Sequence, residues 1–359
     1  MERTTALVFS WLNFLTKKRY DILVEKFGSL DEALGHVGEE LLKALGCQQE
    51  TIYRTLNRFD EFDPEIYEGE LAKRGICFLS CEDEAYPASL KNIPDFPVFL
   101  YYKGSLDILA QPSIGCVGRR EMSTYGKRVA EAFVPAFARA GMVTVSGLAK
   151  GIDAEVAKET LSAGGKTVAV VGHGLADIYP SANRGLAKEI INSGGLILSE
   201  FSLDQSADKF TFPARNRIIA GLSLGTVVLE AGEGSGALIT AELALEYGRD
   251  VFAVPGDIFD PNFLGCHQII SRGQAKLVCT PEEVLQEIGV VALAAESHEF
   301  QSEDPEEVSI YEALTTMPQS VSDLVDRAEL DTAIINAKLT MLELNGSAKN
   351  VGNGMWVRA

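Results

Sequence analysis

The chain has 359 residues, 46% of them hydrophobic, which suffices for about two or three domains with buried cores and excludes wholesale disorder. The formal net charge of −19 excludes long-range attraction to a polyanion. Most of that charge lies in residues 281–359, whereas residues 110–280 are nearly neutral and can still carry a local basic patch. No apolar run approaches the roughly 20 residues that span a bilayer, and residues 1–18 lack a secretory cleavage site.

Residues 1–75 are predicted to form a small helical domain, because leucines recur there at helical spacing and Ser29 precedes Glu32 as in a capping box. The segment resembles helix-hairpin-helix and sterile-alpha modules, which bind DNA or protein, although a packing role is the simpler interpretation. Residues 76–110 contain three prolines and a strand-like run over 98–102. They are predicted to be a connection that packs onto the next domain.

From residue 113 onward, short apolar runs alternate with helical segments such as 125–140 and 237–247. This alternation is typical of βαβ units and predicts an α/β fold with a doubly wound, mainly parallel sheet. A further strand is expected over 276–279, and Pro281 is expected in the first turn of a closing helix. We assign residues 76–289 to this domain. The expected strands are residues 114–117, 143–145, 167–171, 196–198, 226–229 and 251–254.

An acidic segment, residues 290–307, is predicted to be a flexible linker. Residues 308–359 follow with helical apolar spacing and a hairpin centred on Gly352 and Gly354, which together predict a winged helix. Winged helices usually bind DNA. Acidic residues outnumber basic ones here, so contact with protein is the favoured interpretation and contact with DNA the alternative.

Ligands of open parallel sheets bind beyond the carboxyl ends of the strands. Glycines, small polar residues and basic groups follow five of the predicted strands, at residues 117–126, 145–153, 172–175, 199–200 and 230–236. Glycine lets backbone amides approach a phosphate closely, and the following helix adds a partial positive charge. The loops therefore predict a phosphate-binding edge.

Common catalytic motifs are incomplete. Residues 163–167 end like a Walker A loop but precede a strand, the Gly172–Gly174 loop lacks the third glycine of a dinucleotide fingerprint, and no GxSxG frame surrounds Ser146 or Ser235. No nucleophile–base pair is evident, so we expect no enzyme and no cofactor. His173 is expected to be a polar loop residue, and Asp153 and Glu230 to orient loop amides.

The stretch from Lys209 to Arg217 combines three basic residues with Phe210 and Phe212. Arginine matches phosphate oxygens and aromatic rings can stack on bases. A salt-bridge cluster with buried aromatics is the structural alternative. With Arg119, Arg120, Lys127 and Arg128 near the first strand of the series, single-stranded nucleic acid is the better fit.

Six scattered cysteines without a CxxC pair indicate free thiols in a reducing cytoplasm and no zinc site.

The order and spacing of several motifs resemble the DNA-processing protein A family, also called DprA or Smf. The likeness covers nearly the whole chain. The matching segments are Val117-Gly118 with Arg120 and Tyr125-Gly126, the run 145–153, Tyr179-Pro180 with Asn183, Ser199-Glu200, the run 212–223, the run 235–241 and Val254-Pro255-Gly256.

The resemblance implies an extended Rossmann-like domain and a protein without enzymatic activity. Such a protein binds and shields single-stranded DNA, loads the RecA recombinase during uptake of transforming DNA, and dimerises through that domain. The resemblance and the loop chemistry together assign DNA contact to Gly118, Arg119, Arg120, Ser123, Tyr125, Gly126, Ser146, Gly147, Lys150, Gly151, Asp153, Gly174, Lys209, Phe212, Arg215, Asn216, Arg217, Ser235 and Gly236.

Some positions depart from the family pattern. Arg119 stands where the family usually has serine, which adds a charge; Ala157 and Ser181 replace a frequent histidine and a frequent basic residue. Two other functions stay open. A nucleotide phosphoribohydrolase shares the fold, but its glutamate spacing fails after Gly236, and release of free base from AMP would reveal it. A scaffold for recombination proteins would bind partners but not DNA.

Overall fold

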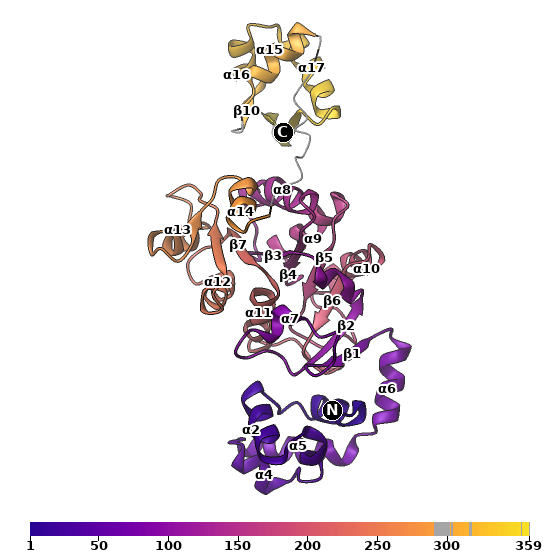
Figure 1. Ribbon diagram of the computed structural model, residues 1–359. Coiled ribbons are helices and arrows are strands. Elements are labelled where there is room, and N and C mark those ends of the chain that lie inside the picture. Colours follow the sequence, from indigo (N-terminus) through magenta and orange to yellow (C-terminus); the bar gives the residue numbers. More distant parts are fainter. Residues whose placement is uncertain (291–301, 303, 316–317, 353, 359) are drawn as a thin grey trace. The chain divides into compact units, whose positions relative to one another are not determined.

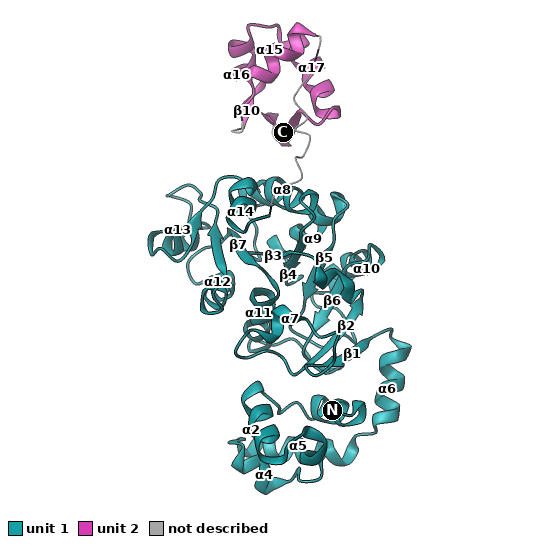
Figure 2. Cartoon of the chain, in the orientation of Figure 1, with its two compact units in different colours: residues 1–293 teal, residues 294–359 magenta. Residues whose placement is uncertain are grey.

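The computed structural model describes residues 1–290, 302, 304–315, 318–352 and 354–358. The chain divides into two compact units, residues 1–293 and residues 294–359 (Figure 2). Most of the predicted linker lies outside the described residues. Within the described part of the chain, no helix is both long enough and apolar enough to cross a lipid bilayer.

A single nine-stranded sheet lies at the centre of the first unit (Figure 1). Its strands are β1 (Cys77–Ser80), β2 (Phe99–Gly104), β3 (Ser113–Gly118), β4 (Val143–Ser146), β5 (Thr167–Val170), β6 (Leu196–Ser199), β7 (Gly225–Glu230), β8 (Asp250–Ala253) and β9 (Lys276–Leu277). The spatial order is β1-β2-β6-β5-β4-β3-β7-β8-β9. From β6 across to β9 all neighbours are parallel, so the mainly parallel, doubly wound sheet predicted from the sequence is confirmed.

Strands of this sheet are buried on both faces, which explains their nearly continuous apolar sequences. Ile114 and Cys116 of β3 belong to one core cluster and Val117 to the other, as the two-residue period of a strand requires. The covering helices are α7 (Ala88–Lys91), α8 (Thr124–Arg139), α9 (Ile152–Ser162), α10 (Arg184–Asn192), α11 (Thr211–Leu222), α12 (Gly236–Glu246), α13 (Leu264–Ser271) and α14 (Pro281–Glu287), with 3₁₀ turns at Leu106–Ala110 and Ser181–Asn183. Helices α8, α9 and α14 pack together on one face, and α11 and α12 pack together on the other.

The segment predicted as a connection, residues 76–110, extends the sheet instead. Strand β1 pairs antiparallel with β2, and β2 pairs antiparallel with β6. Tyr101 of β2 lies opposite Ser199 of β6, a partner almost a hundred residues away in sequence. A pairing of such long range leaves no local signal in the sequence, and for that reason periodicity did not reveal it.

Six helices precede the sheet: α1 (Arg3–Leu12), α2 (Lys17–Phe27), α3 (Leu30–Leu34), α4 (Glu39–Ala44), α5 (Gln49–Glu61) and α6 (Pro64–Lys73). Their buried residues belong to the same core cluster as one face of the sheet. Ser10, Tyr67 and Tyr101 join the two parts through hydroxyl hydrogen bonds of 2.7 and 3.1 Å, and the Tyr67 hydroxyl also accepts the backbone N–H of Leu203. The helical segment therefore packs as part of the first unit.

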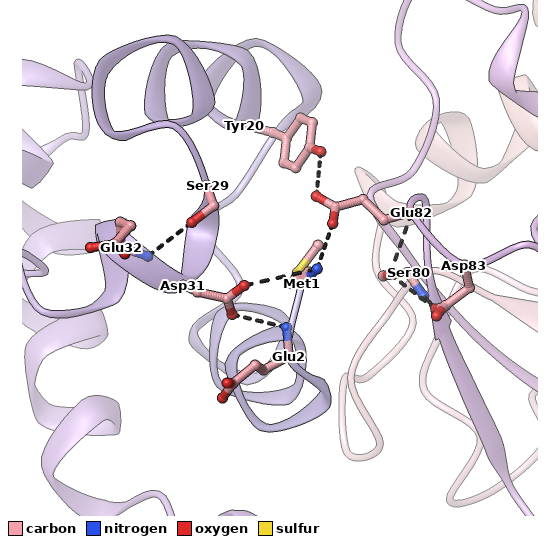
Figure 3. Close-up of polar contacts among 9 residues, drawn as sticks. All are labelled: Met1, Glu2, Tyr20, Ser29, Asp31, Glu32, Ser80, Glu82 and Asp83. Carbon is pink, nitrogen blue, oxygen red and sulfur yellow. Dashed lines mark hydrogen bonds and ion pairs between the residues drawn. The ribbon is translucent and has the colours of Figure 1, made fainter.

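Polar contacts near β1 tie the N-terminus to this unit (Figure 3). The amino group of Met1 lies 2.7 Å from a carboxylate oxygen of Glu82, and the Tyr20 hydroxyl donates to the other oxygen. Ser29 caps α3 by accepting the N–H of Glu32, as its place in the sequence predicted. Because Glu82 lies just beyond β1, these contacts fix the first helices against the sheet edge.

The second unit has the three helices and the hairpin of a winged helix. Its elements are α15 (Pro305–Ala313), β10 (Gln319–Ser320), α16 (Val321–Ala328), α17 (Thr332–Leu344), β11 (Ala348–Gly352) and β12 (Met355–Arg358). Helix α15 starts three residues earlier than the expected domain start at residue 308. Asp304 caps this helix and Pro305 is its first residue. Acidic residues in its first turn interact favourably with the positive end of the helix dipole. Lys338 of α17 is already paired with three carboxylates of the α15 start.

Candidate nucleic-acid interface

The sheet reverses its winding between β3 and β7, which is where ligands of such sheets usually bind. A pocket of about 500 Å³ opens beyond the carboxyl ends of these strands. Four stretches supply its walls: the end of β3, the segment after β4, the start of α11 with the loop before it, and the start of α12. We call it the strand-end pocket. Of the residues singled out in the sequence, it brings together Gly118, Arg120, Asp153, Lys209, Phe212, Arg215, Asn216, Ser235 and Gly236.

Arg120 and Phe212 form the most distinctive contact in this pocket. The guanidinium carbon of Arg120 lies 4.6 Å from the centre of the Phe212 ring, within the range of a cation–π interaction. Within the described ranges, no carboxylate forms an ion pair with Arg120, so its N–H donors remain available to a ligand. Lys209 is exposed beside it and extends over the ring of Phe210 at 5.0 Å. One wall of the pocket thus offers two cations and an aromatic face.

Asp208 fixes the chain that carries these groups. Its carboxylate accepts the backbone N–H groups of Phe210 and Thr211 at 2.6 and 2.9 Å and so caps the start of α11. Because Lys209 directly follows Asp208 and Phe212 lies in the first turn, the cap sets the positions of both. An aspartate shortly before the first turn of a helix is a capping signal that can be read from the sequence.

Arg215 is not a free cation. It is 5% exposed and its guanidinium lies 3.5 Å from the carboxylate of Asp153, which is 6% exposed. Burial lowers the pKa of Arg215, opposed by the Asp153 charge. The guanidinium fills the space that a Cβ at Gly147 would need, and Asp153 also accepts the N–H of Ala149 at 3.4 Å. The pair therefore supports the loop over residues 147–153. It forms part of the pocket wall but adds no net charge to the pocket.

Arg217 points away from the strand-end pocket and does not line it. Its guanidinium lies 2.5 Å from Glu200 and 3.5 Å from Asp95, on the other side of α11. Burial raises the pKa of Glu200, and the Arg217 charge opposes that shift. The salt-bridge alternative considered for the 209–217 stretch thus describes Arg217, and in part Arg215, whereas Lys209 and Phe212 face the pocket.

The other predicted site residues do not line the strand-end pocket. Gly147 and Lys150 line an adjoining pocket of about 270 Å³, together with Arg120, Phe212 and Tyr179. Gly174 lines a separate hollow. Ser146 is buried and donates to the carbonyl of Cys116, and the Tyr125 hydroxyl donates to the carbonyl of Pro255. None of the pockets described here includes Ser123, Tyr125, Gly126, Ser146, Gly151 or Arg217.

Glu230 at the end of β7 orients the loop after β3, as predicted. Its carboxylate accepts the backbone N–H of Ser123 at 3.2 and 3.1 Å, and Ser123 in turn caps α8 by accepting the N–H of Gly126. Burial raises the pKa of Glu230. A Cβ on Gly126 would fall on the Glu230 carboxylate, so a larger residue there would displace the carboxylate from Ser123. This contact fixes the segment that presents Arg119 and Arg120.

His173 has a structural role, in agreement with its predicted place as a polar loop residue. One ring nitrogen lies 2.8 Å from the carbonyl of Gly174, and the other contacts the backbone of Tyr179. Two residues of the family motifs that were not among the expected DNA contacts also shape the site. Tyr179 lies 6.1 Å from Phe212 between ring centres, and Asn183 donates to the carbonyls of Leu148 and Ala149.

The fold and this site define a Rossmann-like protein with a cationic, aromatic pocket at the switch point of its sheet. Residues 77–289 match the family model described as DNA recombination-mediator protein A, and residues 294–354 match the DprA winged helix domain. The chain belongs to the DprA family, also known as Smf, as its motifs predicted.

Curated relatives agree with this assignment. The DNA processing protein DprA of Streptococcus pneumoniae is 44% identical over 242 residues, covering 67% of this chain and 83% of the relative. Protein Smf of Escherichia coli is 38% identical over 284 residues, covering 77% and 76% of the two chains. The chain is thus similar to one relative named as a DNA processing protein and to another named Smf.

Two solved structures are also similar. The crystal structure of Streptococcus pneumoniae DprA matches with a TM-score of 0.66 and 37% identity, covering 80% of this chain and 98% of that one. A Helicobacter pylori DprA structure, described for its single-stranded DNA binding mode, matches with a TM-score of 0.53 and 28% identity, covering 59% and 95%. These matches extend the family likeness from sequence to three dimensions.

Proposed function

We propose that the protein binds single-stranded DNA without sequence preference and shields it. The observation that carries the proposal is the placement of Arg120 against Phe212 at the switch point, with Lys209 exposed beside them. Guanidinium and ammonium groups bind phosphates of any sequence, and an aromatic ring stacks on any base. A ring can reach a base face only where the bases are unpaired, which favours single strands over duplex.

The proposed contacts set a salt dependence. Apart from Arg215, which is paired with Asp153, four basic side chains line the strand-end pocket and the pockets that adjoin it: Arg119, Arg120, Lys150 and Lys209. With about 0.7 counterions released per neutralised phosphate of a single strand, three or four contacts give a slope of log K against log salt of about −2 to −3. Since the whole chain carries −19, the association rate should gain little from long-range steering.

Equilibrium binding to labelled oligonucleotides of equal length tests the proposal. Single strands of different composition should bind with similar affinity, the matching duplex should bind clearly more weakly, and the affinity should fall with salt at the stated slope. Equal affinity for duplex and single strand, or no measurable binding, would contradict it. In the latter case the scaffold hypothesis would be favoured.

Glu230→Gln is expected to weaken single-strand binding about three- to tenfold while leaving the fold intact, because a neutral amide oxygen accepts the Ser123 N–H more weakly than the carboxylate does. The loss should be uniform across sequences. Fluorescence anisotropy measures the affinity, and circular dichroism checks the fold. Full affinity in this variant would show that the loop after β3 holds Arg119 and Arg120 without this contact.

We further propose that the protein loads the RecA recombinase on the strand it covers and forms a dimer through the Rossmann-like domain, as the family resemblance implies. Ile258 and Phe259 support an interface, because they are 70% and 88% exposed in the segment between β8 and α13. RecA should begin to hydrolyse ATP sooner on a single strand that this protein already covers than on one that it does not cover. Light scattering should give a mass of twice the 38.8 kDa of one chain.

The winged helix is proposed to contact protein rather than DNA, because Lys338 on its α17 is occupied by carboxylates.

We expect the protein to act in the cytoplasm. The six cysteines are all free thiols, two of them exposed, and such thiols persist in a reducing compartment.

A further inference from the structure

A second pocket adjoins the strand-end pocket, and Phe212 does not line it. It has a volume of about 550 Å³ and lies between the loop after β3 and the glycine-rich loop after β7. Its lining includes Arg119, Gly232, Gly234 and Asn262. Arg120 and Ser235 line both pockets, so the two are contiguous at the same edge of the sheet. We call it the β7-loop pocket.

Both walls of the β7-loop pocket are held in place by backbone contacts. On one side, Ile152 donates its N–H to the carbonyl of Arg119 at 3.0 Å, and Gly151 (φ +75°) leaves no room for a Cβ against the carbonyls of Arg119 and Arg120. On the other side, the N–H of Gly265 donates to the carbonyl of Ala231 at 2.8 Å. The guanidinium of Arg119 therefore projects from a fixed point toward a fixed loop, which lowers the ordering cost of binding.

Arg119 and Arg120 serve different pockets although they are neighbours. Arg120 lies over Phe212, whereas an Nη of Arg119 comes within 3.8 Å of the position that a Cβ on Gly232 would occupy. Arg119 thus lies against the loop after β7, away from the Phe212 ring. A strand that leaves the strand-end pocket past Arg120 would meet Arg119 next.

The charge of Arg119 is only loosely compensated. Among the described residues its ion-pair partner is Glu121, at 3.9 Å, whose side chain is 91% exposed. An exposed pair of this length contributes little and can open at small cost. Glu233 at the rim is also exposed, and Glu230 nearby is occupied by the N–H of Ser123. A phosphate can thus replace Glu121 as the partner of Arg119.

We propose that the β7-loop pocket binds a second backbone phosphate of the strand, with Arg119 as its contact. This rests on the proposed function and extends it, because the bound path would then continue from Phe212 past Arg120 to the loop after β7. At this position the family usually has serine, so the added guanidinium gives this chain one charged phosphate contact more than a serine supplies.

Arg119→Ser restores the usual residue and tests the proposal in the full-length chain. Affinity for an oligothymidylate should fall about three- to tenfold, and the salt slope should become shallower by about 0.7, the value for one lost phosphate contact. Arg119→Lys should keep the slope. Arg139→Ser is the matched control, since it removes the same charge from the far, exposed end of α8 and should change neither quantity.

The outcomes separate this proposal from the proposed function. An unchanged affinity and slope in Arg119→Ser, with binding lost in Arg120→Ala, would overturn the second phosphate contact and leave single-strand binding in place. A weaker affinity with an unchanged slope, or an equal change in Arg139→Ser, would also overturn it. No loss in either Arg119→Ser or Arg120→Ala would contradict the proposed function itself.

Discussion

Replacing Arg120 with alanine is expected to lower the affinity for single-stranded DNA about 10- to 100-fold, the largest loss among single substitutions at this site. The change removes a charge-assisted phosphate contact and the cation on the Phe212 ring together. Every sequence should be affected alike, because neither interaction reads a base edge. The salt slope should become shallower by about 0.7.

Titrations of Arg120→Ala and Arg139→Ala at several salt concentrations check this expectation. The control removes an equal charge at the far end of α8, whose 16 residues span about 24 Å at 1.5 Å per residue. It therefore separates the effect of position from the effect of net charge. Equal affinities for the two variants would remove Arg120 from the DNA contact and with it the main support for the strand-end pocket.

Replacing Arg215 with alanine is expected to act on stability before it acts on DNA. Removing one partner of a buried ion pair leaves the other charge uncompensated, which costs about 3–5 kcal/mol. Asp153 would be left buried beneath the 147–153 loop. Urea denaturation should show this loss. The double variant with Asp153→Ala should recover part of it, because neither charge then remains.

The alternative for Arg215 is direct contact with a phosphate. In that case Arg215→Ala would keep its stability and lose affinity with a shallower salt slope, and the double variant would bind no better than the single one. The buried pair predicts the reverse: a lower free energy of unfolding in the single variant, with affinity lost only in proportion to the disturbed loop.

The central sheet could be predicted closely from sequence because its parallel strands are buried on both faces. Such strands appear as short apolar runs, and all six runs expected between residues 113 and 254 fall on observed strands. Close approaches explain two of the glycines that follow them, because the Ile152 side chain lies against Gly118 and the carbonyls of Arg119 and Arg120 lie against Gly151. Strands β1 and β2 were missed as part of the sheet, because their pairing depends on partners distant in sequence.

The roles of the arginines could not be read from their spacing. Arg215 and Arg217 lie two residues apart on α11, which rotates them about 200° from one another. One therefore meets Asp153 beneath the 147–153 loop and the other meets Glu200 and Asp95. Arg120 and Lys209 have no such partners among the described residues. The sequence shows how many basic residues there are. Whether each one is free to bind DNA depends on carboxylates that only the fold brings near.

A crystal structure of the full chain with a short oligothymidylate would test the account most directly. We expect a phosphate within hydrogen-bonding distance of the Arg120 guanidinium, a base against Phe212, and Arg215 still paired with Asp153. A strand bound on another surface, with Arg120 and Phe212 unoccupied, would contradict the assignment of DNA binding to the strand-end pocket.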